Sequence, residues 1–249
     1  MSNVVVVSVI NFIGALLFGM LGVGAAPVFI PAIQSLGYAT VATVFPLAIL
    51  LNGINSGFAL IPFARGKSVD WRNGAILSVS AGVFSFLGAF LTGYVPLKIL
   101  LWALVIVLAA LGIRTLMMSG KAEPETQPQT SRILSIGLPT AAFAGFFGGL
   151  LAIGGGILAP FLLIIGYKMK QSSGTTALVA TVASFAGLLG FMAHANLPVS
   201  FLLVSILVIS VASVIGAWLT MKVAKPSWLR VLLGLIIRVS ALRMLMTLI

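Results

Sequence analysis

The feature that most restricts the fold of this chain is an apolar run from Ile133 to Tyr167 that three consecutive glycines interrupt. Glycine costs a helix roughly 1 kcal/mol per residue relative to alanine, so Gly154, Gly155 and Gly156 predict a break in the run. A weaker copy, Gly22-Val23-Gly24-Ala25-Ala26-Pro27, follows the first apolar run of the chain. In lipid, a broken helix is tolerated only where protein or a water-filled cavity surrounds the freed backbone groups. Both breaks are therefore predicted to be functional features inside the protein.

Apolar runs long enough to cross a bilayer, which takes about 20 residues, recur from one end of the chain to the other. The sequence is 61% hydrophobic and 7% charged, and a soluble domain of this length could not bury so much apolar surface. These features predict an all-α polytopic membrane protein. The net charge of +11 does not indicate nucleic-acid binding, because the basic residues lie mostly at the ends of apolar runs, where they set membrane orientation.

Short matches between the two halves of the chain indicate an internal duplication. A shift of 129 residues places Pro31 on Pro160, and a shift of 128 places Gly88-Ala-Phe-Leu-Thr92 on Gly216-Ala-Trp-Leu-Thr220. Several such matches occur in order at nearly constant spacing. The predicted organisation is a first transmembrane repeat over 1–118, a polar cytoplasmic linker over 119–132 and a second transmembrane repeat over 133–249.

The positions of lysine and arginine distinguish two ways of threading the chain through the membrane. With simple crossings only, the basic residues divide almost evenly between the two sides. If 4–36 and 133–167 are instead hairpins with two arms each, only Lys98 and Arg243 oppose the others, apart from Arg238 within a span. Cytoplasmic loops carry an excess of Lys and Arg, so the hairpin arrangement is favoured. The predicted fold is two inverted repeats, each a broken-helix hairpin followed by three transmembrane helices.

The length of the hairpin arms favours tips that lie inside the membrane. Each arm has roughly 16 residues and spans about 24 Å at a helical rise of 1.5 Å per residue. That is slightly less than a hydrocarbon core of about 30 Å. We therefore expect the two hairpins to enter from opposite faces. Broken helices that meet near the midplane in inverted repeats recur among secondary transporters.

Helices are predicted to begin after the breaks, at about Pro27 and Gly156. A helix N-terminus exposes unpaired N–H groups and about half a positive charge. Two such ends at the midplane would bind an anion without a buried Arg or Lys, and glycine would let the backbone approach the ligand closely. The alternative is that the glycines only allow tight helix packing, which is the preferred interpretation for Gly14, Gly88 and Gly216.

Polar residues also cluster in the helix that follows each hairpin. A polar residue in mid-span is costly unless it finds a partner, and the sequence leaves both interhelical hydrogen bonds and substrate contacts open. No Asp or Glu lies inside a predicted span, so proton coupling through a buried carboxylate is not expected. No nucleophile–base pair or metal-ligand cluster is evident, so no enzyme activity, cofactor or metal is predicted. The predicted substrate-binding residues are Gly24, Ala25, Ala26, Asn52, Asn55, Gly154, Gly155, Gly156, Pro160, Thr175, Thr176 and Ser184.

Three stretches of the chain resemble the TauE/SafE family of sulfite exporters. They are Gly19-Met-Leu-Gly22-Val-Gly24 through Pro31, Gly149-Leu-Leu-Ala-Ile-Gly154-Gly155-Gly156 through Pro160, and Ser173-Gly174-Thr175-Thr176-Ala177. The first departs from the family pattern, because Gly24-Ala25-Ala26-Pro27 replaces a glycine-rich stretch. The resemblance implies export of sulfite, sulfoacetate or a related organosulfonate across a prokaryotic cytoplasmic (inner) membrane.

The breaks and the resemblance together predict a secondary transporter that works by alternating access around the two hairpin tips. A passive anion channel and a transporter of another small organic acid are the alternatives. The expected partners are a small anionic substrate and the lipid bilayer, with no nucleic acid. A homodimer is one option for the oligomeric state.

Overall fold

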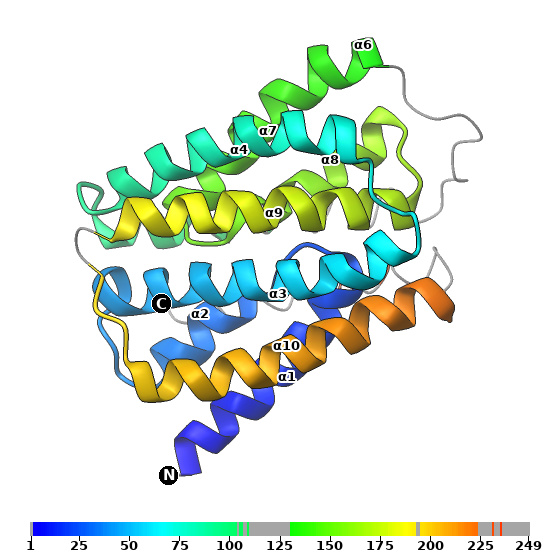
Figure 1. The fold of residues 1–249 in the computed structure, drawn as a ribbon. Helices are drawn as coiled ribbons and strands as arrows, with labels where there is room; N and C mark the ends of the chain where they lie inside the picture. Colours follow the sequence, from blue (N-terminus) through cyan, green and yellow to red (C-terminus); the bar gives the residue numbers. More distant parts are fainter. Residues whose placement is uncertain are drawn as a thin grey trace.

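The computed structural model of the chain describes residues 2–103, 130–192 and 195–223, together with residues 105, 106, 109, 231 and 235. These residues contain helices and no strand, and five helical segments are long and apolar enough to cross a membrane (Figure 1). The predicted class, an all-α polytopic membrane protein, is confirmed. Most of the predicted linker over 119–132 and most of the last predicted span lie outside the described residues.

The helices follow the apolar runs in order. The α-helices are α1 (Ser2–Leu21), α2 (Ala26–Gln34), α3 (Phe45–Arg65), α4 (Trp71–Thr92), α6 (Thr130–Arg132), α7 (Leu138–Leu150), α8 (Leu158–Ile165), α9 (Met169–Phe191) and α10 (Val199–Lys222). Two π-helical turns, η1 (Thr40–Val44) and η2 (Ile133–Gly137), lead into α3 and α7, and a 3-10 turn, η3 (Gly154–Ile157), leads into α8. The side chain of Asp70 caps α4 by accepting a hydrogen bond from the Asn73 N–H at 3.1 Å.

The helices form a layered bundle with α3 and α9 at its centre. Helix α4 packs against α7 and α9, α3 lies between α9 and α10, and α1 packs along α10 (Figure 1). The two central helices carry many of the buried polar residues, which include Asn52 and Asn55 on α3 and Ser184 on α9. The fold therefore places the polar side chains of both halves against one another in the interior.

Small residues set the distance between the packed helices. The α-carbon of Gly88 faces the Phe146 carbonyl, that of Gly216 faces the Leu16 carbonyl, and that of Gly14 faces the Val28 side chain. A methyl group at any of these positions would meet atoms of the neighbouring helix. These contacts agree with the packing interpretation of Gly14, Gly88 and Gly216.

Replacing Gly216 with alanine is expected to lower the free energy of unfolding by about 1–3 kcal/mol, because the new Cβ overlaps the Leu16 carbonyl and α1 must move. Gly57→Ala is the matched control. Its Cβ would lie 3.5 Å from the Thr181 side chain, which is ordinary contact, and alanine favours the helix. Unfolding in mixed detergent–SDS micelles measures both variants. Equal loss of stability in the two would show that packing at Gly216 is not the cause.

Both predicted hairpins are present, but their arms are unequal. The first joins α1, with 20 residues, to α2, with 9, and the second joins α7, with 13, to α8, with 8. The expectation of arms of similar length was therefore wrong. The residues after the tips form only short helices, because Pro31 lies inside α2 and a left-handed Gly166 ends α8.

The second break is also displaced from its predicted position. The helix ends at Leu150, the irregular residues are Leu151 to Ile153, and Gly154–Ile157 already form a 3-10 turn. Ala152 has a φ of 57°, which is unusual for a residue with a Cβ. The α-helical arm begins at Leu158 rather than at about Gly156, whereas the first-half arm begins at Ala26, next to the predicted Pro27.

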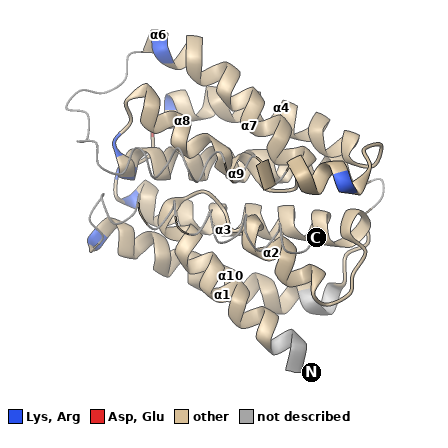
Figure 2. Ribbon diagram, turned by 180° about the vertical axis from the view of Figure 1, so that it is seen from behind, with Lys and Arg blue, Asp and Glu red and all other residues tan. Residues whose placement is uncertain are grey.

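Most of the described basic residues lie at one end of the bundle, here called the basic end (Figure 2). Helix α3 ends there at Arg65 and α4 starts there. The Asp70 N–H donates to Thr175 Oγ1 at 3.1 Å, and Lys170 Nζ donates to the Met221 carbonyl at 3.2 Å, which brings the start of α9 and the end of α10 to the same level. Lys98 follows the far end of α4 and lies at the opposite end. Among the described basic residues, this distribution is consistent with the hairpin arrangement, which stays a prediction.

The hairpins open toward different ends of the bundle. Helix α2 leads back to η1, whose Ala42 accepts a hydrogen bond from the Asn196 N–H at 2.8 Å at the end opposite the basic one. Helix α8 leads instead to Tyr167, which contacts Asp70 at the basic end. In Figure 1, α1 and α2 accordingly open to the left and α7 and α8 to the right. An internal two-fold relation between the repeats stays a prediction.

Candidate functional site

The two helix breaks meet in the interior of the bundle, on either side of Asn52. A Cβ added to Gly24 would overlap the Asn52 side chain, and one added to Gly154 would overlap Asn52 and the Ser184 hydroxyl. A Cβ on Gly156 would overlap the carbonyl oxygen of Val23. The backbone of the first break therefore lies directly against the backbone of the second. We call the contact region of these residues the junction.

Asn52 connects the two halves of the chain at the junction. Its Oδ1 accepts a hydrogen bond from the Ala26 N–H at 2.9 Å, at the start of α2. Its Nδ2 donates to Ser184 Oγ on α9 at 3.0 Å. Both side chains are fully buried. A single amide thus satisfies the first N–H of one short helix and orients a hydroxyl from the other half.

The glycine triplet brings further backbone donors to the junction. Gly154, Gly155 and Gly156 are buried, and Gly154 has a φ of 65°, which favours glycine. Within the described part of the chain, the amide groups of these three residues make no hydrogen bond outside their own 3-10 turn. The first N–H groups of a helix have no intrahelical partner. Buried donors of this kind are costly unless something accepts from them.

Asn55 forms a second polar contact one turn along α3. It is hydrogen-bonded to Ser213 on α10 and is fully buried. With its amide oriented to suit its neighbours, Nδ2 donates to the Ala15 carbonyl at 3.0 Å and Oδ1 accepts from the Ala25 N–H at 3.2 Å. Asn55 therefore holds the first break against α1 and α10. The sequence analysis did not predict a role for Ser213. The one feature that could have indicated it is its position as a polar residue within an apolar span.

The structure brings most of the predicted site residues to the junction and leaves others outside it. Gly155 packs against Ala180 and Ala183 of α9. Pro160 is buried in the first turn of α8. Thr175 and Thr176 precede Ser184 by more than two helical turns, so they lie about 12 Å or more along α9. Thr175 instead accepts from the Asp70 N–H, whereas the buried Thr176 hydroxyl has no partner among the residues that the structure describes.

A polar cluster at the basic end was missed at the sequence level. The Tyr167 hydroxyl donates to Asp70 Oδ2 at 2.9 Å, and Asn73 Nδ2 donates to the same oxygen at 2.7 Å. Together with Thr175, these contacts tie the α3–α4 loop to the segments that begin and precede α9. Burial, followed by the hydrogen bond and negative charge of Asp70, raises the pKa of the Tyr167 hydroxyl above its usual value. The one sequence feature that could have indicated this cluster is Asp70, an acidic residue in a loop between two apolar runs.

Tyr167→Phe is expected to lower the free energy of unfolding at pH 7 by about 1–2 kcal/mol, because one hydrogen bond to a carboxylate is lost. Since the pKa of Tyr167 is raised on folding, its contribution is complete below pH about 10 and is lost as the pH rises further. Wild type should therefore lose more stability than Tyr167→Phe above pH 10. Thermal unfolding against pH measures this, with Tyr94→Phe, an exposed position, as the control. Identical profiles for wild type and Tyr167→Phe would contradict the assignment.

The junction consists of uncharged polar groups. It offers amide and hydroxyl groups and no charged side chain. No group of three or more His, Cys, Asp or Glu lies together among the residues that the structure describes. The groups present can donate hydrogen bonds to an acceptor, and the starts of α2 and η3 add positive partial charge.

Comparison with known proteins identifies similar chains. The family model described as "Sulfite exporter TauE/SafE" matches residues 7–244. A "Probable membrane transporter protein y4hK" from Sinorhizobium fredii is 29% identical over 238 residues, which cover 94% of this chain and 95% of the relative. The "Probable membrane transporter protein YunE" from Bacillus subtilis is 26% identical over 77% of this chain and 80% of its own. The "Probable membrane transporter protein MJ0441" from Methanocaldococcus jannaschii is 24% identical over 78% of this chain and 75% of its own. No solved structure matches the chain significantly.

Proposed function

Because the chain belongs to the TauE/SafE sulfite exporter family and is a multi-pass membrane transporter rather than an enzyme, we propose that its substrate is a small sulfur-containing anion. Sulfite, sulfoacetate or a related organosulfonate is exported across the prokaryotic inner membrane by alternating access. The substrate binds at the junction. The proposed binding residues remain those of the two breaks together with Asn52, Asn55, Pro160 and Ser184. Thr175 and Thr176 lie about 12 Å or more from Ser184 along α9, so they are not part of the proposed contact with the substrate.

The observation that carries this proposal is the bridge that Asn52 makes between Ala26 and Ser184. It joins the start of α2 to Ser184 in the middle of α9, in a buried region next to Gly154, where the 3-10 turn η3 begins. An oxyanion accepts several hydrogen bonds at once, and the amides of Gly154 and Gly155, at the start of the 3-10 turn, supply donors for it. A neutral or cationic substrate gains less from these donors and from the positive ends of the helices.

The directions of the two hairpins support alternating access. The first opens away from the basic end and the second toward it, so the junction lies between two segments with access to opposite ends of the bundle. Rocking of one hairpin against the other would expose the same donors to each side in turn. The homodimer also stays a prediction, which native mass spectrometry of the purified protein tests.

Exchange of labelled sulfite across proteoliposomes tests the proposal. Vesicles preloaded with unlabelled sulfite should accumulate external labelled sulfite transiently, because a carrier exchanges one substrate for another. Saturation and inhibition by sulfoacetate are expected as well. Absence of sulfite and sulfoacetate transport, with transport of other organic acids, would reject the proposed substrate class.

A passive anion channel is the second candidate, and one observation favours it. Asp70 is the acidic residue of the described segments, and it lies in the α3–α4 loop rather than within a membrane span, so no carboxylate is placed there to couple transport to protons. A channel gives flux without counterflow and without steep saturation. The same proteoliposome experiment therefore separates the two mechanisms.

A further inference from the structure

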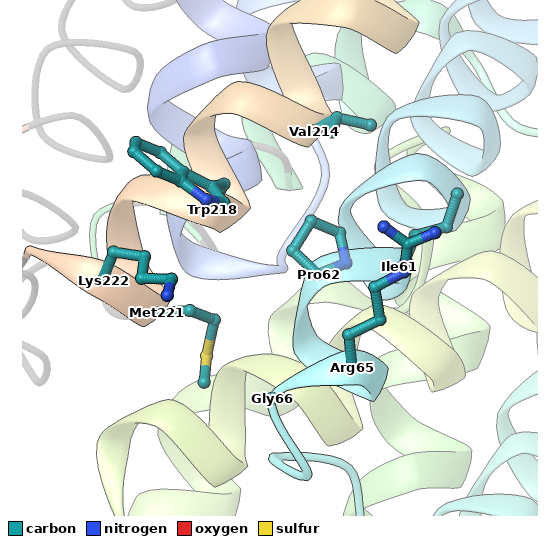
Figure 3. A pocket seen from close by; sticks show the side chains of 8 residues that line it. All are labelled: Ile61, Pro62, Arg65, Gly66, Val214, Trp218, Met221 and Lys222. Carbon is teal, nitrogen blue, oxygen red and sulfur yellow. The ribbon is translucent and has the colours of Figure 1, made fainter.

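A cavity of about 550 Å³ lies between the basic-end halves of α3 and α10, away from the junction (Figure 3). Ile61 and Pro62 of α3 and Val214 and Trp218 of α10 form apolar walls. Arg65 and Lys222 border the same cavity, one from each helix. None of these residues takes part in the junction contacts described above. The cavity therefore needs an explanation of its own.

The cavity opens on the outside of the bundle. Trp218 is 50% exposed and Ile61 is 42% exposed, so its apolar walls continue onto the surface that faces lipid. Lys222 is the last residue of α10 and Arg65 the last of α3, which places both cations at the level where a helix leaves the membrane. Tryptophan is enriched at this same level in membrane proteins.

The two cations have no acidic partner in the described segments. Asp70, the acidic residue of those segments, is engaged by Tyr167 and Asn73. Lys170 adds a third positive charge nearby, since its Nζ donates to the carbonyl of Met221, another residue of the cavity wall. The cavity thus combines a positive rim, without an acidic partner among the described residues, with apolar walls.

We propose that this cavity binds the headgroup of an anionic phospholipid, with its phosphate between Arg65 and Lys222 and an acyl chain along Ile61 and Trp218. Guanidinium groups match phosphate oxygens, and basic pockets between transmembrane helices on the cytoplasmic side bind acidic headgroups. The volume is that of a site for a molecule much larger than a free inorganic anion. The apolar walls favour an amphipathic ligand over a soluble one.

Native mass spectrometry of the intact protein in detergent, titrated with phosphatidylglycerol or phosphatidylcholine, tests the proposal. Wild type should retain phosphatidylglycerol in preference to phosphatidylcholine. The double variant Arg65→Gln/Lys222→Gln should bind phosphatidylglycerol roughly 10- to 30-fold more weakly, because two basic contacts are lost. The matched control, Lys67→Gln/Arg72→Gln, removes the same charge from the same end of the bundle but outside the cavity, and it should bind as wild type does.

A third variant tests the cavity without changing charge. Val214→Trp fills the space beneath the cations and should also weaken phosphatidylglycerol binding, whereas the fold is checked by size-exclusion chromatography and helical circular dichroism. Equal losses in both double variants would overturn the proposal, because the effect would then be one of net charge. Equal retention of phosphatidylcholine, or displacement of phosphatidylglycerol by millimolar inorganic phosphate, would overturn it as well.

Discussion

Gly154→Ala is expected to reduce sulfite transport by about 100-fold, because the new methyl group occupies the junction itself. Its Cβ would overlap the Ser184 hydroxyl and approach Asn52 Nδ2 to 2.5 Å, so the bridge between α3 and α9 must open. The φ of 65° adds backbone strain of about 1–2 kcal/mol for a residue with a side chain. The variant should reach the membrane and unfold at a lower temperature than wild type. Initial rates of labelled sulfite exchange in proteoliposomes measure the effect.

Gly37→Ala is the matched control for this prediction. Gly37 also has a positive φ, 83°, but nothing lies within 4 Å of the position that a Cβ would take. The backbone strain is therefore similar, whereas the junction is untouched. Transport by Gly37→Ala should stay within about twofold of wild type. A similar loss in both variants would mean that backbone strain, and not occupation of the junction, reduces transport.

Asn52→Ala is expected to have the second large effect, a loss of about 2–3 kcal/mol of stability together with most of the transport activity. The substitution leaves the Ala26 N–H without its acceptor and Ser184 without its donor, in a region with no exposure to water. The start of α2 then loses its hydrogen bond to α3, and α3 loses its hydrogen bond to α9. Unfolding in mixed micelles and exchange rates in proteoliposomes give the two quantities separately.

Ser78→Ala serves as the control for loss of a buried polar group. Ser78 lies on α4, is 4% exposed, and its hydroxyl has no partner among the described residues. Its removal should change stability by less than about 0.5 kcal/mol and leave transport intact. If Asn52→Ala had effects as small as those of Ser78→Ala, the bridge would contribute neither to stability nor to transport. That result would contradict the proposed role of the junction.

The general architecture followed from the sequence because lipid leaves few alternatives. Apolar run lengths and glycine clusters predicted the helices and the two breaks, and the basic residues predicted that both breaks are hairpins. Asn52 and Ser184 were predicted as polar residues that need partners. Their contact with each other depends on the register in which α3 packs against α9, and no local sequence pattern determines that register.

Other features depended on packing that the sequence does not reveal. Helix α7 ends at Leu150, before the glycine triplet. The break includes Ala152, which has a positive φ, a conformation that sequence reasoning would expect at a glycine. Thr175 belongs to the family-like stretch, yet its rotation on α9 directs it to the Asp70 N–H at the basic end. The hydrogen bond between Tyr167 and Asp70 joins residues far apart in sequence, so no local sequence pattern predicts it.

The position of a bound anion tests the junction most directly. Selenite is a close chemical analogue of sulfite, and its selenium atom gives an anomalous signal in crystals of the protein. The expected result is an anomalous peak at the junction, within hydrogen-bonding distance of the amides of Gly154–Gly156 and close to Asn52. A peak only at the cavity of Arg65 and Lys222, or no peak at the junction in crystals of a protein that transports selenite, would contradict binding by the paired helix breaks.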